Sequence, residues 1–410
     1  MRIDKLGYVI YKMNLLSLKS IFRLISSILT RGLNLSALLH FSSNMFPHHI
    51  AIHDSKGSIT YEQLNKTSTK LANYFYHHEQ IKAGIRLGFV CRNHTTLVQG
   101  LFAASRVGAD IFLLNPSLSI SQLRDHIERF QLKYLIVDND WNDQLEQEKN
   151  LKVIPVSKVE SALRSPDKIM NEKLPKTSGS KLMLLTGGTT GKSKQVAHKP
   201  SIFNYLNPFL AILTKLKLLQ YKNVFIATPI FHGYGLAILL AFLFLGKKVF
   251  ITEKFNAETA CHLISEYEIE AITVVPLMIQ KMLQENPKEL HSLRCIASGG
   301  AELSPKLILD VQSKLGPVLY NLYGTSETGL NMIATPHDLQ YSLKTIGKKI
   351  KGMQLRVLDE NQEALPAGII GEFCIKNKWS MQNKKGRWVS TGDLGYYDQN
   401  GYFFLMWAKR

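Results

Sequence analysis

The chain has 410 residues, of which 45% are hydrophobic and 20% are charged. This composition is ordinary for a globular protein of two or three compact units and argues against a disordered chain. The formal net charge of +18 attracts polyanions such as nucleotides, coenzyme A, nucleic acid and anionic lipid headgroups, without choosing among them. The four cysteines are far apart and form no C-x-x-C pair, which argues against a disulfide framework or zinc knuckle and fits a reducing, intracellular setting.

Residues 1–40 form a basic segment in which charges interrupt the apolar residues, so it lacks the layout of a signal peptide. From Leu15 to Arg31 the apolar residues recur at helical spacing and share one face. Basic residues far outnumber the single acid of this segment, Asp4. Such a helix can lie on an anionic membrane surface or pack on its own domain, and the sequence leaves both interpretations open.

Helical and strand patterns then alternate over residues 41–175, which we interpret as a first α/β subdomain. The predicted elements are helices at Tyr61–Tyr76, Thr95–Val107 and Gln122–Phe130 and strands at Arg86–Val90, Ile111–Leu114 and Tyr134–Val137. A polar stretch with two prolines, Ser165–Ser180, predicts a linker or exposed loop.

A second α/β subdomain is expected over residues 176–341 and a β-rich subdomain over residues 342–410. The predicted strands of the two are Lys181–Leu185, Val224–Ala227, Lys248–Ile251, Ala271–Val275, Arg294–Ser298, Leu355–Leu358, Gly371–Ile375 and Tyr402–Leu405. The longest apolar stretch, Leu236–Leu245, is shorter than the ~20 residues of a membrane-spanning helix and predicts a buried helix.

A loop rich in Gly, Thr and Lys follows the strand at Lys181–Leu185. Its residues are Thr186, Gly187, Gly188, Thr189, Thr190, Gly191, Lys192, Ser193 and Lys194. Glycines let several backbone N–H groups face one anion, while the hydroxyls and lysines add donors and positive charge, so the pattern predicts phosphate binding. A glycine-rich surface turn is the plain alternative. A Walker A loop, as in a P-loop kinase, would need glycine in place of Thr186.

The loop resembles the signature loop of the adenylate-forming superfamily, which includes acyl-CoA synthetases, firefly luciferase and peptide-synthetase adenylation domains. Ser193 stands where the superfamily has proline, and Gln195 stands where it has glycine, but neither change removes a phosphate donor. The resemblance implies that Thr189 and Lys194 act in catalysis, together with His232 and Glu327 of the motifs that follow. It implies that the other phosphate-binding positions are Thr186, Gly187, Gly188, Thr190, Gly191 and Lys192.

Further motifs follow in the order that the superfamily shows. Residues 228–235 resemble an element in which His232 lies beside the carboxylate of the acid, although a lone histidine is more often a core residue. Residues 294–303 resemble the adenine-binding turn, with Gly299, Gly300 and Ala301 against the base, although any strand–helix turn can look similar.

Residues 321–329 resemble the superfamily's Tyr-Gly-x-Thr/Ser-Glu motif, which includes Gly324. By that resemblance, Tyr323 stacks on adenine and Asn321 contacts its amino group. Ser326 reaches the α-phosphate, and Glu327 binds Mg²⁺, a hard cation that prefers carboxylate oxygen. In residues 390–395 the resemblance makes Asp393 the acceptor of both ribose hydroxyls. A polar loop and a Gly-Asp hairpin turn are the plain alternatives.

The resemblance covers about residues 40–405 and implies an α/β fold like that of acyl-CoA synthetases, with two mixed, mainly parallel sheets flanked by helices and a small β-rich subdomain. The implied activity is ATP- and Mg²⁺-dependent activation of a carboxylic acid, expected to be a long-chain fatty acid, as acyl-AMP, followed by thioester formation with CoA. We expect a cytoplasmic enzyme of lipid metabolism without a nucleic-acid partner, with contact to the inner membrane surface through residues 1–31. The alternatives are an adenylation domain that loads a carrier protein and a nucleotide- and acid-binding protein without ligase activity.

In the superfamily a small mobile domain with a catalytic lysine follows the large domain. The sequence ends at Arg410, and Trp407 and Ala408 stand where the superfamily has Gly-Arg. We therefore expect these 410 residues alone to adenylate slowly and to ligate little CoA, because one preorganised cation contributes a few kcal/mol to transition-state stabilisation.

Overall fold

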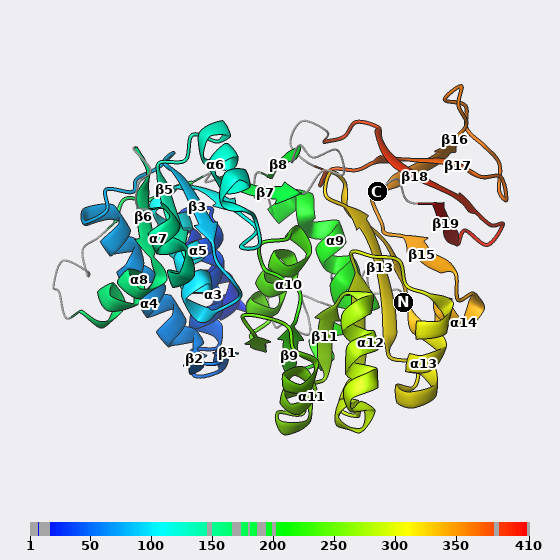
Figure 1. Cartoon of the computed structure of the whole chain (residues 1–410), viewed down its shortest axis with the longest axis horizontal. Helices are drawn as coiled ribbons and strands as arrows, with labels where there is room; N and C mark the ends of the chain where they lie inside the picture. Colours follow the sequence, from blue (N-terminus) through cyan, green and yellow to red (C-terminus); the bar gives the residue numbers. More distant parts are fainter. Residues whose placement is uncertain are drawn as a thin grey trace. The chain divides into compact units, whose positions relative to one another are not determined.

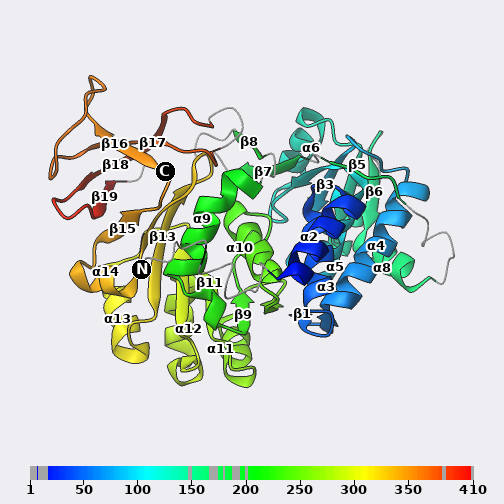
Figure 2. The same ribbon diagram turned by 180° about the vertical axis from the view of Figure 1, so that it is seen from behind.

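The computed structural model describes residue 7 and residues 17–145, 150–165, 174–178, 181–186, 194–198, 202–380 and 385–407. Contacts divide the chain into two compact units (Figures 1 and 2). Unit 1 comprises Met1–Lys12, Ser201–Thr228 and Phe255–Arg410, and unit 2 comprises Met13–Pro200 and Pro229–Lys254. The predicted subdomain boundaries at residues 175/176 and 341/342 stay a prediction.

Unit 2 contains a six-stranded sheet with the order β6-β5-β3-β4-β7-β8. Its strands are β3 (Arg86–Val90), β4 (Asp110–Leu113), β5 (Tyr134–Val137), β6 (Lys152–Pro155), β7 (Leu182–Thr186) and β8 (Lys194–His198). All neighbours pair in parallel except β7 and β8. The helices that alternate with these strands are α4 (Tyr61–His77), α5 (Thr95–Val107), α6 (Ile120–Arg129), α7 (Asn142–Leu145) and α8 (Val156–Arg164). The apolar strands and α6 enclose a core around Phe112 and Leu135, as expected for a sheet that is covered by helices.

The rest of unit 2 is built on a short sheet in which β1 (Ile50–Asp54) pairs in parallel with β10 (Lys248–Ile251) and antiparallel with β2 (Gly57–Thr60). Helix α10 (Gly233–Phe244) packs against α3 (Leu35–Met45). Most of α10 is buried, which confirms the helix predicted from its apolar run. No helix among the residues that the structure describes has the length and apolar character to cross a membrane.

Unit 1 contains a mixed sheet in the order β16-β17-β18-β19-β15-β14-β13-β12-β11-β9. Four strands pair in parallel, namely β9 (Asn223–Ile226), β11 (Ala271–Val274), β12 (Cys295–Gly299) and β13 (Leu319–Thr325). The others pair antiparallel, namely β14 (Gly329–Ala334), β15 (Thr345–Lys349), β16 (Gln354–Leu358), β17 (Gly371–Lys376), β18 (Val389–Tyr397) and β19 (Phe403–Trp407). The helices are α9 (Ile202–Lys215), α11 (Ala257–Glu266), α12 (Pro276–Glu285), α13 (Pro305–Leu315) and α14 (Pro336–Tyr341).

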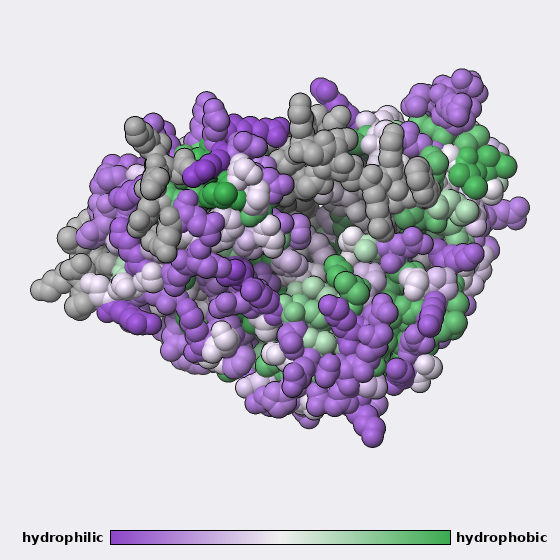
Figure 3. All heavy atoms as spheres, viewed as in Figure 1, coloured by the Kyte–Doolittle hydropathy of each residue, from purple (hydrophilic) through white to green (hydrophobic). Residues whose placement is uncertain are grey.

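The antiparallel strands β16–β19 carry hydrophobic surface, which Figure 3 shows as green atoms over this part of unit 1. The exposed large hydrophobic residues there are Ile369, Ile370, Leu394 and Met406. Isolated exposed hydrophobic residues are normal, and they assign no role to this surface by themselves.

Candidate nucleotide-binding site

The predicted site residues fall on both units, so each group is described within its own unit. In unit 2, Thr186 ends β7 and Lys194 begins β8, and the two are Cα partners in the antiparallel register. The positions Gly187, Gly188, Thr189, Thr190, Gly191 and Lys192 lie outside the described residues. The predicted phosphate loop therefore joins two strands of a hairpin. A Walker A loop leads from a strand into a helix, so this connection argues against the P-loop kinase alternative.

The predicted adenine turn in unit 1 lies beside the strand that carries the tyrosine motif. Strands β12 and β13 are parallel neighbours, with Ser298 opposite Asn321 and Gly299 opposite Leu322. Gly299, Gly300 and Ala301 therefore follow the end of one strand where the neighbouring strand carries Asn321. Gly300 has a φ of +81°, a left-handed conformation that glycine adopts without strain. Carboxyl ends of parallel strands are where α/β proteins bind ligands.

Tyr323 and Asp393 are brought together although they lie 70 residues apart in the sequence. The Tyr323 hydroxyl on β13 donates a hydrogen bond to Asp393 Oδ2 on β18, with 2.5 Å between the oxygens. Burial, followed by the charge of the Asp393 carboxylate, raises the pKa of Tyr323 well above its usual value, so the phenol stays protonated as the donor. The Tyr323 ring also meets Phe373 edge to face, with ring centroids 6.3 Å apart.

A tight turn between β13 and β14 carries Ser326, which is exposed, and Glu327, which is half-buried. Thr325 Oγ1 accepts a hydrogen bond from the Thr328 N–H at 3.1 Å, which closes the turn. A Cβ on Gly324 would come within 2.4 Å of the Gly329 carbonyl oxygen, so this position requires glycine.

Two buried amides, Asn377 and Asn331, hydrogen-bond to this turn and to each other, and the sequence motifs did not predict them. Asn377 Nδ2 donates to the Thr328 carbonyl oxygen at 2.9 Å and to Asn331 Oδ1 at 3.2 Å. Asn377 Oδ1 accepts from the N–H groups of Trp379 and Ser380 at 3.0 and 2.6 Å. Asn377 is 2% exposed. Because buried amides are costly to leave unpaired, this network fixes the turn that carries Glu327.

His232 stands at the N-terminal end of α10 in unit 2 and makes no side-chain cap. Its ring lies 4.2 Å from that of Phe231, centroid to centroid. His232 is exposed, yet neighbouring atoms exclude enough water to lower the pKa of its imidazole from the ordinary value. Its imidazole is therefore neutral at pH 7 and can accept a proton or a hydrogen bond.

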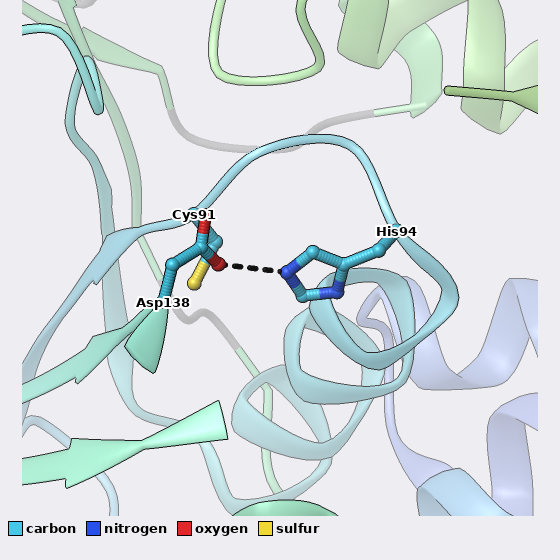
Figure 4. Close-up of side chains that lie close together, drawn as sticks. All are labelled: Cys91, His94 and Asp138. Atoms are coloured by element: carbon cyan, nitrogen blue, oxygen red, sulfur yellow. Dashed lines mark hydrogen bonds and ion pairs between the residues drawn. The ribbon is translucent and has the colours of Figure 1, made fainter. Parts of the chain in front are cut away.

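A second cluster in unit 2, also not predicted from the sequence, joins Cys91, His94 and Asp138 at the ends of β3 and β5 (Figure 4). Their ligand atoms lie within 4.8 Å of one another and all three residues are buried. His94 Nδ1 accepts the Leu97 N–H at 3.0 Å, so Nε2 carries the proton and donates it to Asp138 Oδ1 at 2.9 Å. Figure 4 shows the ring pointing at the carboxylate.

The donor atoms of this cluster are already engaged. Asp138 Oδ2 accepts hydrogen bonds from the Arg92 N–H and guanidinium at 3.0 and 3.1 Å. Burial raises the pKa of the Cys91 thiol well above its usual value, so no thiolate is offered. A metal ion would have to displace these hydrogen bonds, and we interpret the cluster as a structural support of the sheet edge.

The strand ends and turns of unit 1 have the arrangement of a nucleotide-binding α/β protein. A family model described as AMP-binding enzyme matches residues 39–383. The chain therefore belongs to the AMP-binding enzyme family, which confirms the resemblance drawn from its motifs.

Two curated relatives are 2-succinylbenzoate–CoA ligases. The one from a Geobacillus species is 26% identical over 375 residues, which is 88% of this chain and 74% of that protein. The one from Bacillus subtilis is 24% identical over 379 residues, with coverage of 89% and 76%. Both are named for an aromatic acid, so the expectation of a fatty acid gains no support from them.

Solved structures share the fold. The o-succinylbenzoate coenzyme A synthetase of Bacillus subtilis in complex with AMP matches with a TM-score of 0.81 at 22% identity, over 91% of this chain and 78% of that one. The amide bond synthetase McbA of Marinactinospora thermotolerans matches with a TM-score of 0.78 at 20% identity, over 92% and 79%. These similarities confirm the predicted fold class and, because the two proteins form different products, they leave the acceptor open.

Proposed function

We propose that this chain activates an aromatic carboxylic acid as its acyl-AMP and transfers the acyl group to CoA. The observation that carries the proposal is the pairing of Tyr323 with Asp393 beside Asn321, in a chain of the AMP-binding enzyme family. An aromatic face suits a purine, and a nearly buried carboxylate suits the two hydroxyls of a ribose. The motifs at residues 321–329 and 390–395 are separate in the sequence. Because the hydrogen bond brings them together, one nucleotide could contact both.

The proposed reaction has two steps. A carboxylate oxygen of the acid attacks the α-phosphorus of ATP, the bond to the β-phosphate breaks, and pyrophosphate leaves. The sulfur of CoA then attacks the acyl carbon, its proton is released, and AMP leaves. Attack at phosphorus needs positioning and charge neutralisation more than covalent help from the protein.

Each predicted residue has a role in this proposal. Tyr323 and Asn321 hold adenine, Asp393 holds ribose, and Ser326 meets the α-phosphate. Neutral His232 lies beside the carboxylate of the acid. Residues 186–194, with Thr189 and Lys194 acting in catalysis, hold the outer phosphates.

Glu327 is the residue that fits Mg²⁺, because its half-buried carboxylate on a braced turn offers a hard oxygen ligand. Bound Mg²⁺ would neutralise phosphate charge. The buried amides Asn377 and Asn331 hold the backbone of this turn in place before the ligand arrives.

The acid is proposed to be 2-succinylbenzoate or a related aromatic acid, which replaces the fatty acid expected from the motifs. Support comes from the names of the curated relatives. The buried apolar helix α10 would suit an aromatic ring as well as an acyl chain, so it does not favour the fatty acid.

The test is ATP–pyrophosphate exchange with purified protein and a panel of 2-succinylbenzoate, benzoate, and medium- and long-chain fatty acids. We expect exchange with 2-succinylbenzoate or another aromatic acid, and little with fatty acids. Preference for a fatty acid would reject the substrate but keep the adenylation. Absence of exchange with every acid, together with no heat of AMP binding in calorimetry, would reject the function itself.

A second assay addresses the acceptor. CoA and a phosphopantetheine-bearing carrier protein are supplied separately after acyl-AMP has formed, and thioesters are separated by chromatography. Where a thioester forms, we expect it to be acyl-CoA. A thioester formed only on the carrier protein would favour the adenylation-domain alternative.

A further inference from the structure

Helix α2 (Leu18–Arg31) turns its polar side toward unit 2. Ser20 and Ser27 are its buried residues. Ser27 Oγ and His40 Nδ1 of α3 are hydrogen-bonded at 2.8 Å, and Arg23 Nη1 lies 3.4 Å from the Met45 sulfur, also on α3. Figure 2 shows α2 beside α3. The contacts of this helix with its own unit are therefore largely polar.

The opposite side of α2 is apolar and exposed. Leu18, Phe22, Ile25 and Leu29 recur every three or four residues, and they are 88%, 72%, 50% and 59% exposed. A helix of a water-soluble domain ordinarily buries its apolar stripe and exposes its polar one. Helix α2 does the reverse, and this orientation leaves a stripe of four large side chains that burial in an apolar medium would stabilise.

The charged Lys, Arg, Asp and Glu residues near this stripe in the sequence are all basic. Residues 5–53 contain five Lys or Arg residues and no Asp or Glu. Three of these cations, Lys19, Arg23 and Arg31, lie on α2 itself. Lys19 is exposed beside the stripe, whereas Arg23 and Arg31 are half-buried, and no acid of residues 5–53 neutralises these cations.

We propose that α2 binds the surface of an anionic lipid bilayer, with its apolar stripe among the acyl chains and the exposed Lys19 at the headgroups. Helices of this kind lie in the plane of the interface. The 14 residues span about 21 Å, which is too short to cross a hydrocarbon core of about 30 Å. A second copy of the chain fits less well, because two such helices face to face would bring together like charges without an acid in the segment.

The test is flotation of the full chain with vesicles of phosphatidylcholine alone or of equal parts phosphatidylcholine and phosphatidylglycerol. We expect binding to the mixed vesicles, and at least about tenfold weaker binding to the neutral ones, because each cation near an anionic surface contributes to binding. No binding to either, or equal binding to both, would overturn the proposal. This result is independent of the adenylation assay.

Two double variants test whether vesicle binding depends on α2 or on any exposed apolar side chain. Phe22→Ser with Leu29→Ser should weaken binding to the mixed vesicles by at least about tenfold, since two anchors are lost. The control, Leu277→Ser with Leu309→Ser, changes leucines that are 59% and 51% exposed on α12 and α13, and should bind like the unaltered chain. Circular dichroism would show whether both variants fold.

Sedimentation without lipid tests the alternative that the apolar stripe of α2 binds a second copy of the chain. The unaltered chain and the α2 variant should have the same mass. A dimer that the α2 substitutions convert to a monomer, or vesicle binding that survives those substitutions, would contradict the membrane proposal.

Discussion

The Tyr323–Asp393 hydrogen bond holds an aromatic face and a carboxylate in fixed relation before any nucleotide binds. Removing the carboxylate should cost more than removing the hydroxyl, because in the proposed site the carboxylate itself accepts the ribose hydroxyls, with about 1.5–3 kcal/mol for each hydrogen bond to a charged group. The Tyr323 hydroxyl only orients that carboxylate. Asp393→Asn should weaken AMP binding at least about tenfold, and Tyr323→Phe, which keeps the ring, by a smaller factor. Isothermal calorimetry with AMP measures both.

The chain offers a matched control for this prediction. Tyr341 Oη donates to Asp398 Oδ2 at 2.7 Å in the same unit, and Tyr341 is exposed. Tyr341→Phe and Asp398→Asn therefore make the same chemical changes in a pair that no motif assigns to the nucleotide. Equal losses of AMP affinity in the two pairs would contradict the assignment of Asp393 to the ribose.

Asp138 gives a prediction about pH. Burial alone would raise the pKa of its carboxyl, but hydrogen bonds from His94 and Arg92 outweigh burial and hold that pKa below its ordinary value. A carboxyl of this kind stabilises the folded state fully above the unfolded pKa of about 3.9, and the contribution is lost as the pH falls below it. Asp138→Asn should cost about 3 kcal/mol of unfolding free energy at pH 7 and make the acid side of the stability profile flatter.

Urea unfolding followed through the buried Trp141, which is close to Asp138 in the sequence, measures this effect between pH 3 and pH 7. Asp140→Asn is the control, because Asp140 also pairs with Arg92 but its side chain is 53% exposed, so its loss should cost less than about 1 kcal/mol. If the two variants lose the same unfolding free energy at every pH, the buried cluster around Asp138 does not determine the pH dependence of stability.

At the scale of elements, long apolar or periodic segments could be predicted from the sequence. The expected bounds of β3 and α5 match the observed ones: the apolar run of β3 gives way to Arg92 and Asn93, and α5 lies between its N-cap His94 and the left-handed Gly108. Strand β8 was missed, since Lys194–His198 has no continuous apolar run and becomes a strand by pairing with β7. Strand β14 was missed because the turn before it was interpreted only as a loop that carries ligands.

The candidate site was predicted where a motif keeps its residues close in sequence. The support from Asn377 could not be predicted, because its partner Asn331 lies 46 residues away and no local pattern links a single amide to a distant turn. The orientation of α2 could not be predicted either. Its spacing defines an apolar face, but which face meets the protein depends on the contacts that Ser27 and Arg23 find on α3.

The amide support predicts a coupled loss of stability and function in Asn377→Ala. The substitution leaves the Thr328 carbonyl and two backbone N–H groups without the Asn377 partner, which should cost about 2–3 kcal/mol of unfolding free energy. The turn that carries Glu327 should loosen. We therefore expect the Mg²⁺ concentration for half-maximal pyrophosphate exchange to rise about tenfold, measured by titration of Mg²⁺ at fixed ATP.

Asn400→Ala controls for the loss of an amide, because Asn400 hydrogen-bonds the Tyr341 hydroxyl from an exposed turn. Its Mg²⁺ requirement should not change. A lower melting temperature in Asn377→Ala with an unchanged Mg²⁺ requirement would limit Asn377 to a structural role and separate it from the proposed metal ligand.

At the scale of the whole molecule, the excess of 50 basic over 32 acidic residues is spread unevenly. Five cations stand without an acid in residues 5–53. The remaining +13 of the net charge of +18 lies in residues 54–410, with +7 of it in residues 151–200, which include the predicted phosphate loop. One positive field can therefore attract both a nucleotide and an anionic surface, and the contacts at each site determine which ligand stays.

This field predicts that the association rate of ATP depends on salt. Raising the ionic strength from about 0.01 M to about 1 M shortens the screening length from about 30 Å to about 3 Å, so charges far from the site stop contributing. The association rate constant of ATP should fall at least about tenfold, while its dissociation rate, which depends on short-range contacts, should change less. Stopped-flow fluorescence with a labelled ATP measures both rates. Labelled adenosine, which carries no phosphate, should associate at nearly the same rate at both salt concentrations, and an equal fall for the two ligands would mean that salt acts on the protein and not on the attraction between charges.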